Sequence, residues 1–378
     1  MKCAVCDSSL GKPDYTSKSR TSVTSVCTVL STELLVHLCR HCGFVQTRHL
    51  SNLELAAFWE QYHTLQAAAP DSVYSRTQTQ LRMRSEQEAF QLELLLALPW
   101  SATVAFIGGV RTAALAVLRE RRPDLQIKAF IEDRIYAPSI GKMVPPVPYH
   151  IGSLPNDSAR CFDYVVSLYE LAHEKFPLKG IQAYTALLKP GGRLLVAVPD
   201  LLSNSGDLVV ANHFSHFSAD ALQTVLEKSG LSEIRVDATA FEGRLFATAK
   251  YTGDIQTTSR KPDADSIERI ESFCRYWSEF GDRVKEFEKT QGHNGPAAIY
   301  GAGFYGAFIL SQLAHPGAVE SFYDRGSLSA GREIGGFPVR PASQLPSNQK
   351  VLYIGLNPET ARTFDDSQKR KGLATFFP

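Results

Sequence analysis

Short apolar runs recur through the middle of the chain, at 104–107, 127–131, 162–166 and 194–198. Runs of this length, rich in valine, isoleucine and aromatic residues, are typical of strands buried on both faces of a parallel sheet. Before the last run, Leu187–Gly192 predicts the end of a helix followed by a sharp turn. The pattern is therefore strand, helix, strand, and it predicts an α/β protein with a doubly wound sheet.

Helical periodicity lies on both sides of these strands. The segment 51–98 has helical spacing with a break at a proline, and Tyr62 stands where its first helix is expected to end. After the polar linker 251–263, Asp265 and Glu268 predict a capping box. An amphipathic helix follows, with an apolar face that we expect to be buried between domains, formed by Ile267, Ile270, Phe273, Trp277, Phe280, Val284 and Phe287.

These patterns divide the chain into four parts. A length of 378 residues is enough for two or three domains of roughly 150 residues each. We expect an amino-terminal module with connecting helices, an α/β core, a linker with the amphipathic helix, and a carboxyl-terminal α/β domain, at 1–85, 86–251, 252–292 and 293–378.

The charge of the chain is nearly balanced. Its 40 lysines and arginines and 39 aspartates and glutamates give a net charge of +1, which leaves no field to hold a nucleic acid or an anionic membrane. The sequence has neither an apolar run near 18 residues nor a charged-then-apolar leader. We therefore expect a cytoplasmic protein that binds a small molecule.

Four of the seven cysteines form two Cys-x-x-Cys pairs, Cys3 with Cys6 and Cys39 with Cys42. Without an export signal, this spacing favours metal binding over disulfides, and the alternative is two unrelated pairs of surface cysteines. Two such knuckles place four thiolates around one tetrahedral zinc ion. Because every ligand is then a protein thiolate, no position is open to substrate, and the predicted zinc is structural.

Glycines follow the first core strand, where a doubly wound sheet binds its cofactor. These are Gly108 and Gly109. Glu132 and Asp133 end the next strand, and a carboxylate there normally accepts hydrogen bonds from ribose hydroxyls; the alternative is an ordinary exposed acid. Asn156-Asp157 would lie near the adenine edge of a bound nucleotide.

A second glycine turn lies in the carboxyl-terminal domain. Gly301, Gly303 and Gly306 form a Gly-x-Gly-x-x-Gly sequence between a predicted strand and a predicted helix, which is the context of a phosphate-binding turn. Asp324 closes the next strand about 20 residues later, as the ribose-binding acid of a Rossmann unit does. Gly301, Gly303, Tyr305 and Gly306 are candidate substrate-binding residues.

The sequence FDYV at 162–165, followed by LLKPGGRLLV at 187–196, resembles the second half of a class I S-adenosylmethionine (SAM)-dependent methyltransferase core. The segment 199–217, with NHFSHFS, is similar to bacterial sugar C-methyltransferases. Zinc module, core, helix and Rossmann-like carboxyl-terminal domain together resemble this family over nearly the whole chain. The resemblance implies SAM as the cofactor and a nucleotide-linked sugar, held between core and carboxyl-terminal domain, as the substrate.

The resemblance also implies site residues. His173 and His213 match the last residues of the family's Glu-His and Tyr-His-Glu-His motifs, and Tyr62 would line the substrate pocket or pack between domains. C-methylation beside a ketone needs a base, and histidine titrates near pH 7. We expect His213 to be that base unless it is a packed core residue. The expected polar contacts to substrate are His173, His216, Asn204 and Asn212, although packing is the favoured interpretation for His216.

The chain departs from the family at motif positions, namely Phe106, Val110, Thr112, Ala172, Val210 and Asn212. They replace an acid, two glycines, two further carboxylates and a tyrosine. These departures motivate a second hypothesis, a methyltransferase-like protein that does not methylate and instead binds a sugar nucleotide or supports a partner enzyme. A third, an enzyme that uses NAD at the second glycine turn, ranks last because no hydride-transfer residues accompany that turn.

Overall fold

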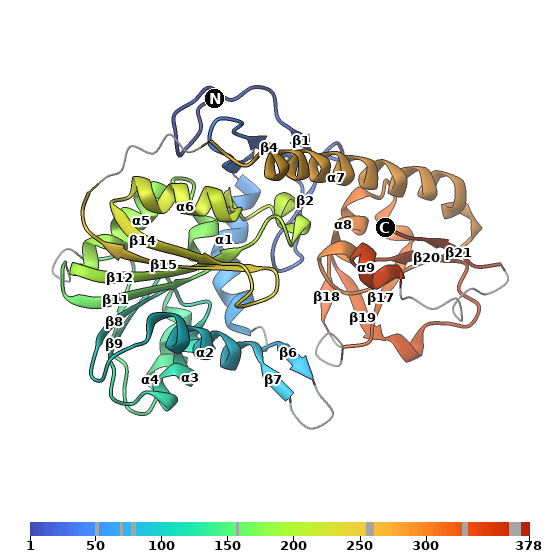
Figure 1. Cartoon of the computed structure of the whole chain (residues 1–378). Coiled ribbons are helices and arrows are strands. Elements are labelled where there is room, and N and C mark those ends of the chain that lie inside the picture. The colour runs from blue at the N-terminus through green and yellow to red at the C-terminus, as the bar shows by residue number, and fades with distance from the viewer. Residues whose placement is uncertain are drawn as a thin grey trace.

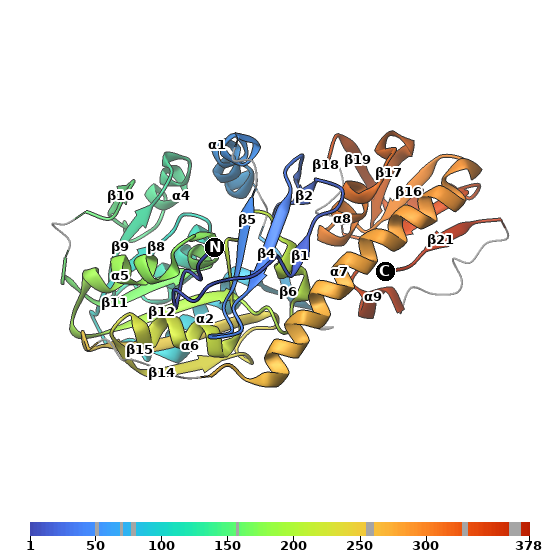
Figure 2. The same ribbon diagram turned by 90° about the horizontal axis from the view of Figure 1, so that it is seen from above.

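The computed structural model describes residues 1–49, 53–68, 71–76, 81–155, 159–254, 261–326, 332–362 and 372–378. Figure 1 shows an α/β core and a carboxyl-terminal α/β domain side by side, with one long helix running from the first to the second. Seen from above, strands of the amino-terminal module lie between these two domains, alongside the long helix (Figure 2). Residues 255–260 of the predicted linker and Asn156-Asp157 lie outside the described residues.

The core sheet is doubly wound. Its strands are β8 (Thr103–Ile107), β9 (Gln126–Ile131), β10 (Tyr149–Ile151), β11 (Phe162–Leu168), β12 (Leu188–Pro199), β14 (Leu231–Asp237) and β15 (Arg244–Tyr251). Among the described residues they have the order β10-β9-β8-β11-β12-β15-β14. All neighbours run parallel except β15, which is antiparallel to both β12 and β14. This is a class I methyltransferase-like sheet, and it confirms the predicted fold class.

Helices cover both faces of this sheet. They are α2 (Arg84–Leu96), α3 (Thr112–Arg121), α4 (Ala137–Gly141), α5 (Pro177–Leu187) and α6 (Ala219–Lys228). Because successive side chains of a strand point to opposite faces, Val104 and Phe106 pack with α2, α3 and α4, whereas Ala105 and Ile107 pack with α5 and α6. Short 3-10 helices connect these elements at η1 (Arg134–Tyr136), η3 (Glu170–His173) and η4 (Ser205–Val209).

Three local predictions are wrong. The first helix does not end at Tyr62, because α1 (Leu53–Ala68) continues to Ala68. Lys189–Gly192 is not a turn between α5 and the next strand, because β12 already begins at Leu188 and absorbs the glycines as an irregularity in its pairing with β11. The predicted capping box at Asp265 and Glu268 does not cap the start of the helix. The long helix α7 (Ala264–Gln291) is capped instead by Asp263, whose carboxylate accepts a hydrogen bond from the Ser266 amide at 2.9 Å. For β12 the pairing with β11 decides where the strand begins, whereas for α7 the aspartate two residues earlier provides the cap.

The amino-terminal module shares a sheet with the core. Its elements are β1 (Tyr15–Thr16), β2 (Ser22–Val23), β3 (Val29–Leu30), β4 (Leu34–Leu38), β5 (Val45–His49), α1 (Leu53–Ala68), β6 (Val73–Arg76) and β7 (Leu81–Met83). The core contributes β13 (Ser215–His216), which pairs with β5 in the order β1-β4-β5-β13. The segment of the candidate base is therefore fixed to the cysteine-bearing module.

The carboxyl-terminal domain is a smaller parallel sheet. Its elements are η5 (Gly292–Asn294), β16 (Ala297–Tyr300), α8 (Phe304–Gln312), η6 (Pro316–Ala318), β17 (Val319–Asp324), β18 (Glu333–Ile334), β19 (Phe337–Pro341), η7 (Ala342–Gln344), β20 (Val351–Ile354), α9 (Pro358–Arg362) and β21 (Ala374–Phe376). The described strands have the order β18-β19-β17-β16-β20-β21, with β18 alone antiparallel among them. This arrangement matches the Rossmann-like pattern expected from the glycine turn.

Candidate functional site

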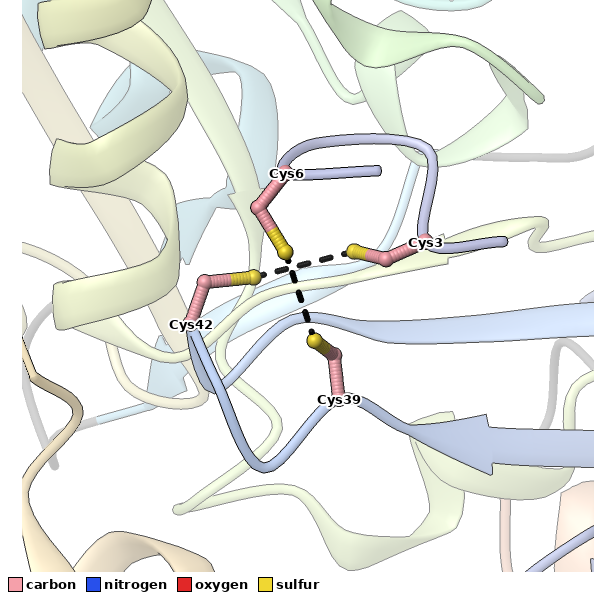
Figure 3. Close-up of side chains that lie close together, drawn as sticks. All are labelled: Cys3, Cys6, Cys39 and Cys42. Carbon is pink, nitrogen blue, oxygen red and sulfur yellow. Dashed lines mark hydrogen bonds between the residues drawn. The ribbon is translucent and has the colours of Figure 1, made fainter. Parts of the chain in front are cut away.

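The four predicted metal ligands lie together (Figure 3). Their sulfur atoms are all within 4.8 Å of one another, with Cys3 Sγ 3.7 Å from Cys42 Sγ and Cys6 Sγ 3.5 Å from Cys39 Sγ. Four sulfurs bound at ~2.3 Å to one tetrahedral zinc ion would lie ~3.8 Å apart. The donor set and its spacing therefore fit a structural zinc ion.

A cavity of about 300 Å³ lies at the carboxyl ends of β8, β11 and β12. Its walls come from the amino-terminal module, α1, the core and the carboxyl-terminal domain. Three predicted site residues meet there, namely Tyr62, His173 and His213. Parallel strands of a doubly wound sheet end at this edge, which is where such sheets bind ligands.

His213 is held by a carboxylate that the sequence analysis did not identify. Its Nδ1 lies 2.6 Å from Oδ1 of Asp207, whose side chain is 2% exposed. The Nδ1 proton therefore points to Asp207, which leaves Nε2 as the basic nitrogen, and Nε2 has no hydrogen-bond partner among the described residues. Burial raises the pKa of Asp207, but the charge of His213 and the hydrogen bonds from both imidazoles outweigh it and lower that pKa.

His216 lies behind this pair rather than in the cavity. It is fully buried, its Nδ1 is 3.0 Å from Oδ2 of Asp207, and its Nε2 is 2.8 Å from the Thr47 hydroxyl. Both ring nitrogens are therefore occupied by protein groups, so His216 orients Asp207 and has no atom free for substrate. This is the packed arrangement that the sequence favoured for His216.

The two asparagines expected to contact substrate lie outside the cavity lining. Asn212 is fully buried, and its amide accepts from the Ser25 backbone N–H at 2.7 Å and donates to the Ser25 hydroxyl at 3.0 Å. It therefore ties the β2–β3 loop to the core. Asn204 is half-buried at the start of η4. Neither side chain contributes a group to the cavity as the structure places them.

His173 and Tyr62 form a second polar pair beside His213. The Nδ1 of His173 donates to the Asn212 carbonyl at 2.8 Å, so its Nε2 accepts from the Tyr62 hydroxyl at 3.1 Å. Burial and the charge of His213 lower the pKa of His173 to about 3. His173 is therefore neutral near pH 7, and its ring lies 5.0 Å from that of His213. These contacts suit a group that orients Tyr62 rather than one that exchanges protons.

The first glycine turn has the backbone of a nucleotide site but not the space. Gly108 has φ +97°, and the Gly109 amide donates to the carboxylate of Glu132 at 3.1 Å. A Cβ atom at Gly108 would overlap the carboxyl of Glu170, and one at Gly109 would overlap the ring of Tyr136. Both groups are side chains of other segments, and both would have to move before a nucleotide could approach the two glycines. Tyr136 is 2% exposed, and its hydroxyl bonds to His63 at 3.1 Å.

The acids near this turn have separate roles. Burial and the charge of Glu132 raise the pKa of Glu170 well above its usual value, so Glu170 keeps its proton to a higher pH than an exposed glutamate does. Asp133 caps η1 by accepting from the Ile135 amide at 2.8 Å and does not reach the turn. Glu132 is therefore the candidate ribose ligand of the two.

The second glycine turn packs mainly against its own domain. Gly301 has φ +108°, and added Cβ atoms at Gly301 and Gly306 would overlap the carbonyls of Gly355 and Gly301. Space is open at Gly303, and Asp324 accepts from the Ala302 amide at 2.8 Å, much as Glu132 does from Gly109. Tyr305 lines a different cavity of about 410 Å³ between η4, α7 and this domain. Of the predicted substrate residues, Tyr62 and Tyr305 thus line two different cavities, and the glycines of this turn line neither of them.

Comparisons with known proteins give a partial structural likeness. No family model and no curated protein matches the chain. Similar solved structures include an O-methyltransferase family protein from Burkholderia thailandensis, with 18% identity, a TM-score of 0.34, and coverage of 40% of this chain and 51% of that protein. CurJ carbon methyltransferase has 13% identity, a TM-score of 0.35, and coverage of 43% and 53%. A possible histamine N-methyltransferase from Thermotoga maritima has 19% identity and a TM-score of 0.35, and the match covers 44% of this chain and 88% of that protein. The chain spans about half the length of the first two, and its fold class rests on its own strand order.

Proposed function

We propose that this protein is a SAM-dependent methyltransferase that acts on carbon of a nucleotide-linked sugar or a related small molecule. One observation carries the proposal: the His213–Asp207 pair opens into a cavity at the carboxyl edge of a class I methyltransferase-like sheet. The cavity volume of about 300 Å³ lies at the lower end of the range for small-molecule sites.

In this proposal His213 removes the proton. Its Nε2 accepts a proton from a carbon next to a carbonyl group, and the imidazolium that forms is stabilised by the Asp207 carboxylate at 2.6 Å. Tyr62, oriented by neutral His173, is the nearby hydroxyl that contacts the substrate. Asp207 of η4 thus supplies a carboxylate to the candidate base, whereas the family resemblance implies one at position 212.

SAM, when bound, supplies an electrophilic methyl group to the carbanion. The residues that would hold it are Gly108, Gly109 and Glu132, with the ribose on the Glu132 carboxylate. Tyr136 and Glu170 must first leave the turn. This requirement gives the proposal a direct test, because each of the two blocking groups can be shortened.

The test is calorimetric titration of the full-length protein with SAM. We expect Tyr136→Ala to bind SAM at least tenfold more tightly than the wild type, because the ring no longer has to be displaced from Gly109. Glu132→Gln should abolish binding. The control is Tyr149→Ala at the start of β10, which removes a tyrosine that is 42% exposed and lies outside the glycine turn, and it should leave SAM binding unchanged. Failure of both the wild type and Tyr136→Ala to bind SAM at millimolar concentration would contradict the proposal.

The filled glycine turn favours one second candidate, a methyltransferase-like protein that binds a sugar nucleotide without methylating it or that supports a partner enzyme. Val110 and Thr112 add Cβ atoms where the family has glycines, in keeping with this candidate. Titration with UDP-glucose as a probe distinguishes the two. Binding of UDP-glucose without any binding of SAM, in wild type and in Tyr136→Ala alike, would favour the second candidate.

A further inference from the structure

Arg244, the first residue of β15, is a half-buried cation without a carboxylate partner among the described residues. Its Nη1 donates to the Gly243 carbonyl at 2.8 Å, but its Nε is buried and has no hydrogen-bond partner in the described structure. Burial lowers the pKa of Arg244, because water that would solvate the charge is excluded. An unpaired buried charge lowers the stability of the folded protein, and an anionic ligand bound at this guanidinium group would compensate for it.

The ring of Tyr169, which also lines the cavity, packs against the guanidinium group of Arg244. The guanidinium groups of Arg84 and Arg244 lie over its ring, with their central carbons 4.7 Å and 5.6 Å from the ring centroid. Tyr169 itself has φ +73°, a conformation that costs energy for a bulky residue. Its hydroxyl donates to Glu88 at 3.0 Å, which fixes the ring. The strained tyrosine therefore holds two cations at one wall of the cavity.

The charges at this wall do not cancel. Glu88 is fully buried and forms ion pairs with both Arg84 and Arg111, and Arg111 also lies 3.9 Å from Asp71. Arg244 and Arg332, which also line the cavity, have no ion pair with any residue that the structure describes. Four guanidinium groups line the cavity, those of Arg84, Arg111, Arg244 and Arg332. Within the described part of the chain they form ion pairs with only two carboxylates, Glu88 and Asp71, so the excess charge at this wall is positive.

We propose that Arg244, together with Arg84 and Arg332, forms a binding subsite for a phosphate group of the ligand that occupies the cavity beside His213. A guanidinium group pairs with an oxyanion through two parallel hydrogen bonds, and the open Nε of Arg244 is one of the donors needed for that geometry. The diphosphate of a nucleotide-linked sugar carries two negative charges in all, so it matches the two guanidinium groups of Arg244 and Arg332, which have no ion pair among the described residues, better than a single carboxylate does. Arg332 belongs to the carboxyl-terminal domain, so the bound phosphate would join that domain to the core.

This inference deepens the proposed function, and it rests on that function for the role of His213 but not for the binding of the anion. The test therefore uses anions alone, in the absence of SAM. Inorganic phosphate, pyrophosphate and acetate are titrated into the full-length wild type, Arg244→Gln, Arg332→Gln and the control Arg193→Gln. Arg193 forms an exposed ion pair with Glu233 at 2.6 Å and is not part of the cavity lining.

We expect pyrophosphate to bind the wild type and Arg193→Gln equally, to bind Arg244→Gln at least tenfold more weakly, and to bind Arg332→Gln several-fold more weakly. Thermal unfolding gives a second readout. Arg244→Gln removes an unpaired buried charge, so it should melt no lower than the wild type in the absence of anions, whereas an arginine with a structural role would lower the melting temperature.

Three results would overturn the inference: no binding of phosphate or pyrophosphate to the wild type, unchanged binding in Arg244→Gln, or tighter binding of acetate than of phosphate. The last would assign the subsite to a carboxylate instead. If anions bind as expected while SAM does not bind to any variant, the subsite stands and the methyltransferase proposal fails. If Arg244→Gln does not fold, the comparison of Arg332→Gln with Arg193→Gln decides the question.

Discussion

Asp207 holds two imidazole rings at once, with one carboxylate oxygen on His213 and the other on His216. The Thr47 hydroxyl fixes the far side of His216, at 2.8 Å. This chain of contacts sets the ring orientation of His213 from behind and leaves its Nε2 toward the cavity. A tautomer fixed in this way is what a general base needs, because the proton-accepting nitrogen must face the substrate.

Replacing the carboxylate by an amide tests this arrangement. Asp207→Asn keeps the shape but loses two charge-assisted hydrogen bonds, so we expect unfolding to become easier by about 2–4 kcal/mol. Methyl transfer, measured with labelled SAM, should fall at least tenfold as well. Asp254→Asn, at an exposed position with no hydrogen bond or ion pair to any residue that the structure describes, is the control and should stay within about 0.5 kcal/mol of wild type. An unchanged unfolding free energy for Asp207→Asn would contradict the assigned contacts.

His173 makes stability depend on pH. Its pKa is about 3 in the folded protein and about 6.5 in the unfolded chain, so between these values the unfolded state binds a proton that the folded state does not. Stability therefore falls as the pH falls through this window, by about 2 kcal/mol between pH 6.5 and pH 5 from this group.

Urea unfolding at several pH values checks this expectation, with His173→Gln expected to flatten the slope. The control His293→Gln removes an exposed histidine and should leave the slope unchanged. The raised pKa of Glu170 acts in the opposite direction below neutral pH, so the informative quantity is the difference between wild type and variant. Equal slopes for wild type and His173→Gln would show that His173 is not buried in its neutral form.

At the scale of elements, the two cysteine knuckles also pack against the core, next to α6 and β13. Cys3, Cys39 and Cys42 belong to the same apolar cluster as α6, and the rings of Phe44 and Phe217 pack at 5.8 Å. The strand β5 that follows the second knuckle pairs with β13, next to the segment of His213. A metal ion at the knuckles would therefore hold one edge of the segment that contains His213 in place.

Loss of one cysteine ligand should therefore remove the metal ion and weaken the contact between β5 and β13 beside the cavity. We expect wild-type protein to contain one zinc ion per chain by elemental analysis and Cys39→Ser to contain none. Stability should drop by several kcal/mol, because a structural zinc site contributes its binding free energy to folding. Cys161→Ser changes an exposed cysteine outside the cluster and should retain the metal and the stability. Metal-free wild-type protein with undiminished stability would rule out a structural role.

At the scale of the whole molecule, α7 joins the domains through one aromatic cluster. Trp277 is fully buried, donates from its indole N–H to the Ser205 carbonyl of η4 at 2.8 Å, and packs against Phe304 and Phe308 of α8 at 6.0 Å and 4.7 Å. It therefore contacts the core and the carboxyl-terminal domain at once. The position of Arg332 relative to the rest of the cavity depends on this contact.

Truncating this residue should loosen the joint. We expect Trp277→Ala to lower the free energy of unfolding by about 3–5 kcal/mol, as for other buried aromatic residues. Limited proteolysis should then cut near the start of α7 sooner than in wild type. Trp100→Ala is the matched control, since Trp100 is 81% exposed. If the two tryptophan variants unfold at the same denaturant concentration, α7 does not join the domains in the way described.

The apolar runs of the sequence were enough to predict four of the core strands, β8, β9, β11 and β12, and the doubly wound fold class, because the period and length of such runs follow from which faces are buried. The two cysteine pairs likewise predicted their own assembly, since the ligand spacing of a knuckle is local. Tyr62, His173 and His213 were predicted from the family resemblance, and the structure places all three in the lining of one cavity.

The tertiary structure decided the rest, because those contacts join residues whose spacing follows no local rule. Asp207 reaches His213 through the path of η4, which no periodicity indicates. Asn212 occupies a motif position, but its side-chain amide is hydrogen-bonded to Ser25, which lies in the loop between β2 and β3, far away in sequence. The filling of Gly108 and Gly109 comes from side chains of two other loops. The sequence by itself determined which strands form and which cysteines gather; packing between distant segments decided which polar groups remain free to meet a ligand.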